Sequence, residues 1–143
     1  LQTIENLHSG TALLHGVTGS GKTLVYIEAV KQALKEERSA IILVPEIALT
    51  SQLVAEFSAH LPNVIVTHSK QTEAQRYAIW KRVISSNDPV VIIGPRSALF
   101  MPVQQLGLVV IDECHEPSFK PSIFSPTRRL SSYKSTSRQT NSR

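Results

Sequence analysis

The residues that could do chemistry begin with a glycine-rich run, Gly16-Val17-Thr18-Gly19-Ser20-Gly21-Lys22-Thr23. Two glycines separated by four residues and followed by Lys and Thr are typical of a phosphate-binding loop. Glycines let the backbone curl so that N–H groups point at phosphate oxygens, and the helix that follows adds its positive end. The run therefore predicts an ATP site in which Lys22 contacts the β- and γ-phosphates and the Thr23 hydroxyl holds Mg²⁺. The alternative is a glycine-rich turn with an exposed lysine.

A second group with suitable chemistry is a pair of acids, Asp112 and Glu113, directly after the apolar run Val109-Val110-Ile111. Asp112 is suited to bind Mg²⁺, directly or through water, and Glu113 to orient and deprotonate an attacking water. A strand that ends in Asp-Glu is weak evidence alone. It becomes strong evidence with a phosphate-binding loop about ninety residues upstream. Together the two motifs predict a site for ATP and Mg²⁺, with Lys22 and Glu113 as its catalytic residues.

The elements that must position these residues alternate between strand and helix. Apolar runs at Thr11–His15, Ala40–Val44, Val64–Thr67, Pro89–Ile93 and Leu108–Ile111 predict strands, the last two fully buried. Helical spacing predicts helices over 22–37, over 49–57, and after Thr72, where Gln75 completes a capping box. The last helix is expected to present Tyr77, Trp80 and Ile84 inward. Tyr77 and Trp80 are expected to be core residues, and the alternative is that they are platforms on which bases stack. Such alternation predicts a doubly wound, mainly parallel α/β sheet with ligands at the carboxyl ends of its strands.

Length and composition limit the function classes. The chain of 143 residues allows one lobe, and no apolar run is long enough to cross a bilayer, which predicts no membrane contact. The single cysteine, Cys114, excludes an internal disulfide, so a cytoplasmic setting is expected. Because the chain begins with Leu1 and its only methionine is Met101, we expect a fragment.

The net charge of +4 is unevenly distributed. Residues 1–120 hold ten basic and eleven acidic residues, whereas residues 121–143 hold five basic residues and no acid. The pI therefore gives no argument for nucleic-acid binding by the folded part. We expect 1–120 to form the lobe, incomplete by comparison with a full motor lobe. Residues 121–143, rich in Ser, are expected to be a disordered basic tail, either left by truncation or an arm that contacts nucleic acid.

Asp112-Glu113-Cys114-His115 resembles the Asp-Glu-x-His box of superfamily 2 helicases. Over about residues 13–120 the sequence is similar to the primosomal protein N′ family of replication restart DNA helicases. The words that carry this resemblance are Leu14 to Thr23, Leu43-Val44-Pro45-Glu46-Ile47-Ala48-Leu49-Thr50, His68-Ser69, Ile93-Gly94-Pro95-Arg96-Ser97-Ala98-Leu99-Phe100 and Leu106-Gly107-Leu108. The resemblance implies a RecA-like lobe of a 3′ to 5′ DNA helicase, using ATP and Mg²⁺. It also implies branched or fork-like DNA, primosome proteins and single-strand binding protein as partners.

The same resemblance assigns further site residues. It implies DNA contacts at Pro45, Glu46 and Thr50, and at Arg96 and Ser97, made to the backbone rather than to bases. The alternative is that Pro45 only stops a strand, Thr50 or Ser51 caps a helix, and Arg96 is a solvated charge. The resemblance also implies that His115 couples the nucleotide and DNA sites.

Several positions depart from the family pattern. Cys114 stands where Glu is usual and Pro95 where Thr is usual, but neither departure removes a phosphate or magnesium ligand. After Lys120 no coupling box, arginine finger or zinc-binding cysteine cluster is recognisable. An arginine finger is commonly worth about 10³ to 10⁵ in rate, so we expect this chain to bind nucleotide better than it hydrolyses it. Another superfamily 2 DNA-dependent ATPase and a non-catalytic nucleotide-binding remnant remain alternatives.

Overall fold

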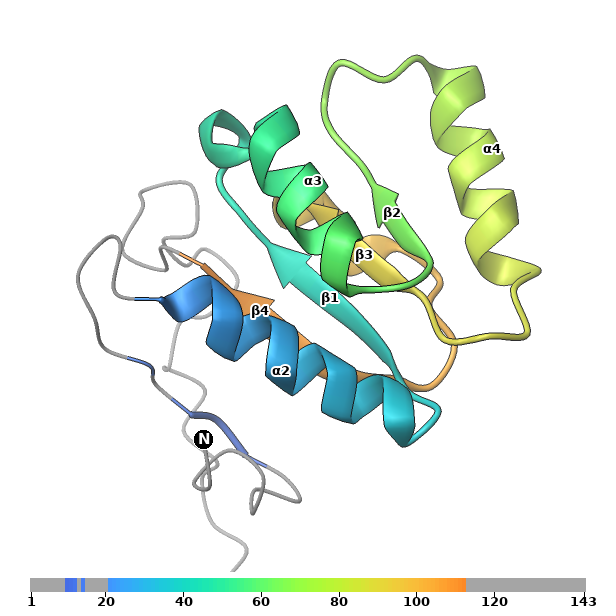
Figure 1. The fold of residues 1–143 in the computed structure, drawn as a ribbon. Coiled ribbons are helices and arrows are strands. Elements are labelled where there is room, and N and C mark those ends of the chain that lie inside the picture. Colours follow the sequence, from blue (N-terminus) through green and yellow to red (C-terminus); the bar gives the residue numbers. More distant parts are fainter. Residues whose placement is uncertain (1–9, 13, 15–20, 113–143) are drawn as a thin grey trace, which may run out of the picture.

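The computed structural model describes residues 10–12, 14 and 21–112 (Figure 1). Along the chain its elements are helix α2 (Lys22–Lys35), strand β1 (Ser39–Leu43), 3-10 helix η1 (Glu46–Ala48), helix α3 (Ser51–His60), strand β2 (Val64–Val66), helix α4 (Glu73–Ile84), strand β3 (Val91–Gly94), 3-10 helix η2 (Arg96–Phe100) and strand β4 (Leu106–Ile111). The predicted alternation of strand and helix is confirmed over this range. The predicted strand Thr11–His15 is wrong where it is described, because Thr11, Ala12 and Leu14 are exposed and belong to no strand. Leu13, His15 and all of the 121–143 tail lie outside the described residues.

The four strands form one parallel sheet in the order β2-β3-β1-β4. The chain leaves β1 through α3 to the outer strand β2, returns through α4 to β3, and then crosses β1 to reach β4. Connections on either side of β1 run in opposite directions, which is the winding pattern that places ligand sites at the carboxyl ends of the strands. The predicted doubly wound parallel sheet is therefore confirmed.

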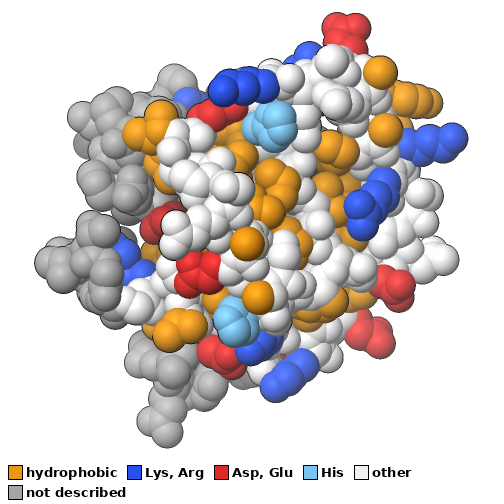
Figure 2. All heavy atoms as spheres, turned by 45° about the horizontal axis from the view of Figure 1, so that its top comes forward, with side chains coloured by type: hydrophobic (Ala, Val, Ile, Leu, Met, Phe, Trp, Pro, Cys, Tyr) orange, Lys and Arg blue, Asp and Glu red, His pale blue; other side chains and the backbone are white. Residues whose placement is uncertain are grey.

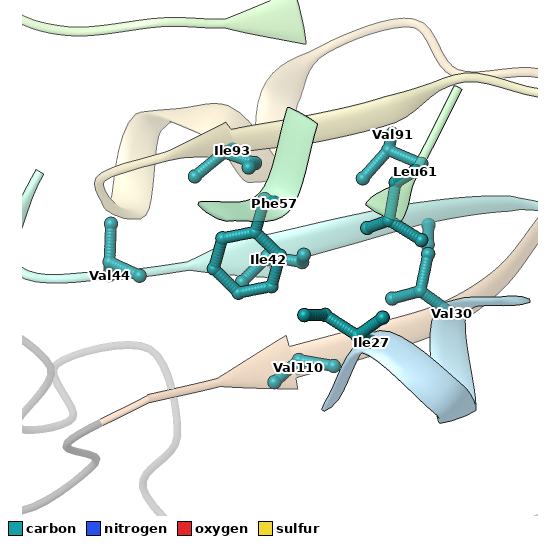
Figure 3. Close-up of a cluster of buried hydrophobic side chains, with 10 residues drawn as sticks. Ile27, Val30, Ile42, Val44, Phe57, Leu61, Val91, Ile93 and Val110 are labelled. Atoms are coloured by element: carbon teal, nitrogen blue, oxygen red, sulfur yellow. The ribbon is translucent and has the colours of Figure 1, made fainter. Parts of the chain in front are cut away.

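One face of the sheet is covered by α2 and α3, which lie side by side in Figure 1. Ile27 and Val30 of α2 and Phe57 of α3 are almost fully buried against Ile42 of β1 and Ile93 of β3 (Figure 3). Alternate residues of a strand point to opposite faces, so Ile41 and Ile92 belong to the other face. Burial on both faces explains why these strands are continuous apolar runs.

The opposite face has a smaller core beneath α4 and the segment that follows β3. Val83 of α4 and Ala98 of η2 are buried there, with Ile79 packed against them. Helix α4 begins at the predicted capping box: the Thr72 hydroxyl accepts from the Gln75 N–H at 3.2 Å, and the Gln75 side chain accepts from the Thr72 N–H at 2.9 Å. Sequence therefore placed this helix correctly.

The side chains that α4 turns toward the core were predicted wrongly. Tyr77 is 65% exposed, and Trp80 and Ile84 are each 42% exposed, whereas Val83 is buried. Val83 is the only buried residue of the helix, with Ile79 packed against the core, so the apolar residues of α4 fall on two faces and only one face is covered. Periodicity alone did not distinguish between the two faces.

Strand β4 also differs from the prediction of full burial. Of its six residues only Val110 is buried, and Val109 and Ile111 are 39% and 38% exposed. In the part of the chain that the structure describes, β4 is an edge strand with its hydrogen-bonded neighbour, β1, on one side. Strand β3 lies inside the sheet, and its four residues are all buried as predicted. None of the described helices is both long and apolar enough to cross a membrane.

Candidate nucleotide site and nucleic-acid interface

The carboxyl ends of all four strands meet at one edge of the sheet. Beyond the strands, the Val44 N–H donates to the Gly94 carbonyl at 3.0 Å, and the Thr67 N–H to Ile93 at 2.9 Å. On the other side, the Asp112 N–H donates to the Leu43 carbonyl at 2.9 Å. These bonds extend the pairing of the strands into the segments that follow them. The segments predicted to contact nucleotide and DNA are therefore neighbours in space.

The end of the predicted phosphate loop lies at the start of α2. Gly21 has φ 80° and ψ 18°, a left-handed conformation that favours glycine, and it directly precedes the first helical residue, Lys22. The first N–H groups of a helix lack intrahelical acceptors, and the helix dipole makes this end positive. Lys22 and Thr23 are both half-buried in this first turn. The start of α2 therefore offers backbone N–H groups to which an anion could bind. Gly16 to Ser20 lie outside the described residues.

Asp112 is held against α2 by a contact that the sequence did not reveal. The hydroxyl of Tyr26 donates to Asp112 Oδ1 at 3.1 Å, between the second turn of α2 and the end of β4. Thr23 lies three residues before Tyr26, on the same side of the helix. A hydroxyl and a carboxylate are hard oxygen ligands of the type that Mg²⁺ prefers. The residues present therefore fit a magnesium ion.

Replacing Tyr26 with Phe tests whether this contact positions Asp112. We expect Mg²⁺-dependent affinity for an ATP analogue to fall by about 2- to 10-fold, since one net hydrogen bond is worth about 0.5–1.5 kcal/mol. Binding of the same analogue without Mg²⁺ should be unchanged, and it serves as the internal control. Equal losses with and without Mg²⁺ would instead indicate a general disturbance of α2.

The segments predicted to contact DNA follow the two central strands. Pro45 is buried after β1, and Thr50 is the N-cap of α3, its hydroxyl accepting from the Leu53 N–H at 3.2 Å. The capping role expected as the alternative is therefore present at Thr50. Arg96 and Ser97 begin η2 after β3, and Ser97 is exposed. The residues predicted to contact DNA after β1 (Pro45, Glu46 and Thr50) and after β3 (Arg96 and Ser97) therefore all lie at the same edge of the sheet.

The loop after β2 belongs to the same region because two close contacts hold it there. A Cβ atom at Gly94 would lie 2.7 Å from the Thr67 carbonyl oxygen, so glycine permits this approach. Two residues further along the loop, the Ser69 N–H donates to Glu46 Oε1 at 2.8 Å, and the Ser69 hydroxyl donates to the same oxygen at 2.5 Å. Glu46 therefore connects the segment after β1 with the loop after β2. In the sequence, Glu46 and His68-Ser69 belong to separate motifs, and their contact was not predicted.

The contact between Glu46 and Ser69 predicts a small acid-dependent loss of stability. The Ser69 hydroxyl and then its N–H stabilise the carboxylate and hold the pKa of Glu46 below its ordinary value. With a folded pKa below the unfolded value of about 4.3, the contribution is present above that value and is lost as the pH falls through the folded pKa. Glu46 is exposed, so we expect less than about 1 kcal/mol.

The measurement is the urea midpoint of wild type and Glu46→Gln at pH 7 and at pH 3. The wild type should be the more stable of the two at pH 7, and the difference should shrink at pH 3. Ser69→Ala should reduce the same acid-sensitive contribution without abolishing it, because the Ser69 N–H still donates to Glu46 Oε1. A difference that is independent of pH would show that the Glu46 charge has no part in the contact.

Three predicted site features lie outside the described residues: Gly16 to Ser20, Glu113 and His115. Tyr26 is the residue of the described site that sequence reasoning missed. Its signal was a hydroxyl-bearing side chain one turn after Thr23, on a helix that otherwise presents apolar residues to the sheet. In the part of the chain that the structure describes, no cluster of three or more His, Cys, Asp or Glu residues could hold a metal ion. Magnesium held by Thr23 and Asp112 would therefore depend on phosphate and water for its other ligands.

The sheet is parallel, α2 begins directly after the left-handed Gly21, and Asp112 directly follows β4. This arrangement is typical of the class of α/β proteins that bind nucleotides. The family model for DEAD/DEAH box helicases matches residues 1–140, and the chain belongs to this family.

The relatives define the group more closely. The sequence is similar to replication restart protein PriA: it is 47% identical over 111 residues to that of Chlamydia pneumoniae, covering 77% of this chain, and 40% identical over 120 residues to that of Bacillus subtilis, covering 83%. The chain spans about 15% of the length of these two relatives. Predicted membership of the primosomal protein N′ group is thereby confirmed.

A solved structure agrees on the fold. A DEAD-box helicase domain bound to an RNA duplex superimposes with a TM-score of 0.50 and 24% identity, covering 64% of this chain and 38% of the other. The likeness confirms the RecA-like lobe predicted from the sequence.

Proposed function

We propose that the chain is the ATP-binding lobe of a 3′ to 5′ DNA helicase that acts in replication restart. The observation that carries the proposal is the contact of Tyr26 with Asp112, which brings the start of α2 and the end of β4 together at 3.1 Å. Membership of the helicase family and similarity to replication restart protein PriA supply the reaction class and the process.

The described residues suggest how the lobe would hold its ligands. Lys22 and the N–H groups of the first turn of α2 would bind the β- and γ-phosphates, and Thr23 and Asp112 would hold Mg²⁺. Bound Mg²⁺ would neutralise charge that develops on the phosphates. Glu113 would orient and deprotonate the attacking water, and His115 would couple this site to the segments after β1 and β3. Those segments would bind the DNA backbone through Arg96, Ser97 and the turn that begins at Pro45.

The test is a titration of the chain with a fluorescent ATP analogue, with and without Mg²⁺. We expect saturable binding that Mg²⁺ strengthens. A chain that is folded by circular dichroism but shows no saturable binding would contradict the proposal.

The process needs a second measurement, because other superfamily 2 motors share the nucleotide motifs. In a protein that carries this lobe with a second motor lobe, fork-like DNA should stimulate ATP hydrolysis more than linear duplex DNA. Preferential stimulation by linear duplex would instead favour a restriction or transcription-coupled repair motor. Because the chain spans about 15% of its first two relatives, branched DNA, primosome proteins and single-strand binding protein are proposed partners of the longer proteins.

A further inference from the structure

A pair of exposed aromatic rings stands beside the proposed DNA-binding edge. Tyr77 and Trp80 lie one turn apart on α4, their rings nearly parallel at 14° with centroids 6.4 Å apart. Trp80 is 42% exposed and Tyr77 65% exposed. Exposed aromatic rings of this kind are unusual on a surface that contacts nothing, because burying them would be favourable.

These rings line one part of a hollow of about 310 Å³ whose other walls combine polar and apolar side chains. Ser97 and Met101 come from the segment after β3, and His68 and Ser69 from the loop after β2. The remaining lining residues are Thr67, Arg76 and Ile79. The volume lies at the lower end of the range for small-molecule sites, and it is open to solvent on one side. Ser97 also belongs to the segment proposed to contact DNA, so the hollow and that segment are continuous.

The chemistry of the hollow favours a nucleic acid over an apolar peptide. Rings provide faces for bases, a guanidinium at Arg76 provides a charge for phosphate, and hydroxyls at Ser69 and Ser97 provide hydrogen bonds. Lys70 and Lys81 lie near these residues in the sequence and add positive charge. The acids in this region are Glu46, whose carboxylate accepts a hydrogen bond from the Ser69 hydroxyl, and Glu73. On the face shown in Figure 2, hydrophobic side chains lie exposed among Lys, Arg, His, Asp and Glu side chains. A wholly apolar partner would leave these polar groups without partners.

We propose that this hollow binds unpaired bases of a single DNA strand, which stack on Trp80 and Tyr77 while Arg76 contacts the adjoining phosphate. The inference rests on the proposed function, because it extends the backbone contacts at Arg96 and Ser97 by a site for the bases. Stacking is tolerant of sequence, since every base has an aromatic face. The site would therefore bind the DNA strand without recognising its base sequence.

Trp80 is the only tryptophan of the chain, so tryptophan fluorescence, excited selectively over tyrosine, reports on this site alone. Titration with oligo-dT should quench it, whereas an abasic oligonucleotide with the same number of phosphates should not. Quenching by both to the same extent would overturn base stacking. An absence of quenching by either would overturn the site.

Variants make the test independent of tryptophan fluorescence, using the anisotropy of labelled oligo-dT at one fixed salt concentration. Trp80→Ala should weaken binding roughly 5- to 150-fold, and Trp80→Phe should retain most of it. Ile84→Ala is the matched control: Ile84 is equally exposed on the same helix but does not line the hollow, so binding should be unchanged. Unchanged affinity in a folded Trp80→Ala would overturn the proposal.

Failure here is distinguishable from failure of the proposed function. The fluorescent ATP analogue is titrated into the same protein preparations. Normal ATP-analogue binding with no base-dependent DNA binding overturns only the stacking site. Loss of analogue binding in the wild-type chain would count against the proposed function itself.

Discussion

Lys22→Ala is expected to weaken binding of a fluorescent ATP analogue by at least about tenfold. The ammonium of Lys22 stands in the first turn of α2, directly after the left-handed Gly21, where the positive end of the helix and the lysine charge would act on the same phosphates. Hydrogen bonds to charged groups are worth about 1.5–3 kcal/mol each, and the variant loses those to the β- and γ-phosphates together. The Mg²⁺-dependent titration proposed above measures the effect.

The matched control is Lys35→Ala. Lys35 carries the same charge in the last turn of α2, at the other end of the same helix from the proposed site. Its replacement lowers the net charge equally, so a general electrostatic effect would weaken binding in both variants. We expect binding to weaken in the Lys22 variant alone. Equal affinity in wild type and in a folded Lys22→Ala would exclude the phosphate loop as the binding site.

Much of the fold was predictable because several local signals agreed. Pro45 stops the apolar run in the sequence, and β1 ends just before it, at Leu43. Thr72 and Gln75 form the predicted capping box, and continuous apolar runs mark the two central strands. Each of these signals acts within a few residues. The parallel direction of the strands then follows from the connections, because helices join parallel strands. The order β2-β3-β1-β4 was not predicted from the sequence.

Burial was less predictable, since it depends on neighbours that are distant in sequence. Val109 and Ile111 of β4 have the composition of a central strand, yet β4 has one hydrogen-bonded neighbour among the described strands. Tyr77 and Trp80 fall at helical spacing, yet Val83 takes the buried position on α4. In both β4 and α4 the apolar pattern predicted that a strand or a helix forms, but not which of its residues are buried.

In the site, too, sequence motifs predicted individual residues but not the contacts between them. Sequence motifs located Lys22, Thr23 and Asp112, whose roles follow from chemistry shared by nucleotide sites. Tyr26 belongs to no motif, and its contact with Asp112 joins residues 86 positions apart. The bond between Ser69 and Glu46 likewise spans 23 positions. Contacts of this kind depend on how the strand ends meet, which no local pattern specifies.

A second acid follows Asp112 in the chain, and its proposed role separates binding from turnover. Asp112 lies against α2 through Tyr26, which suits a residue that holds Mg²⁺ close to the phosphates. Glu113 is the next residue in the chain, and in the proposed mechanism it acts on the attacking water instead. Gln keeps the size of Glu and can still orient a water, but it cannot accept a proton. The two proposed roles therefore predict different phenotypes.

Glu113→Gln is expected to retain ATP-analogue binding while reducing turnover by about 10²- to 10⁴-fold, the usual contribution of a general base. Binding is measured on the chain itself, and turnover as phosphate release, with saturating DNA, in a protein that carries this lobe and a second motor lobe. Glu36→Gln, which changes an exposed acid at the far end of α2, should affect neither measurement. Because binding precedes hydrolysis, weaker binding by the Glu113 variant would indicate a role in holding Mg²⁺. Turnover that persists alongside normal binding would mean that another group activates the water.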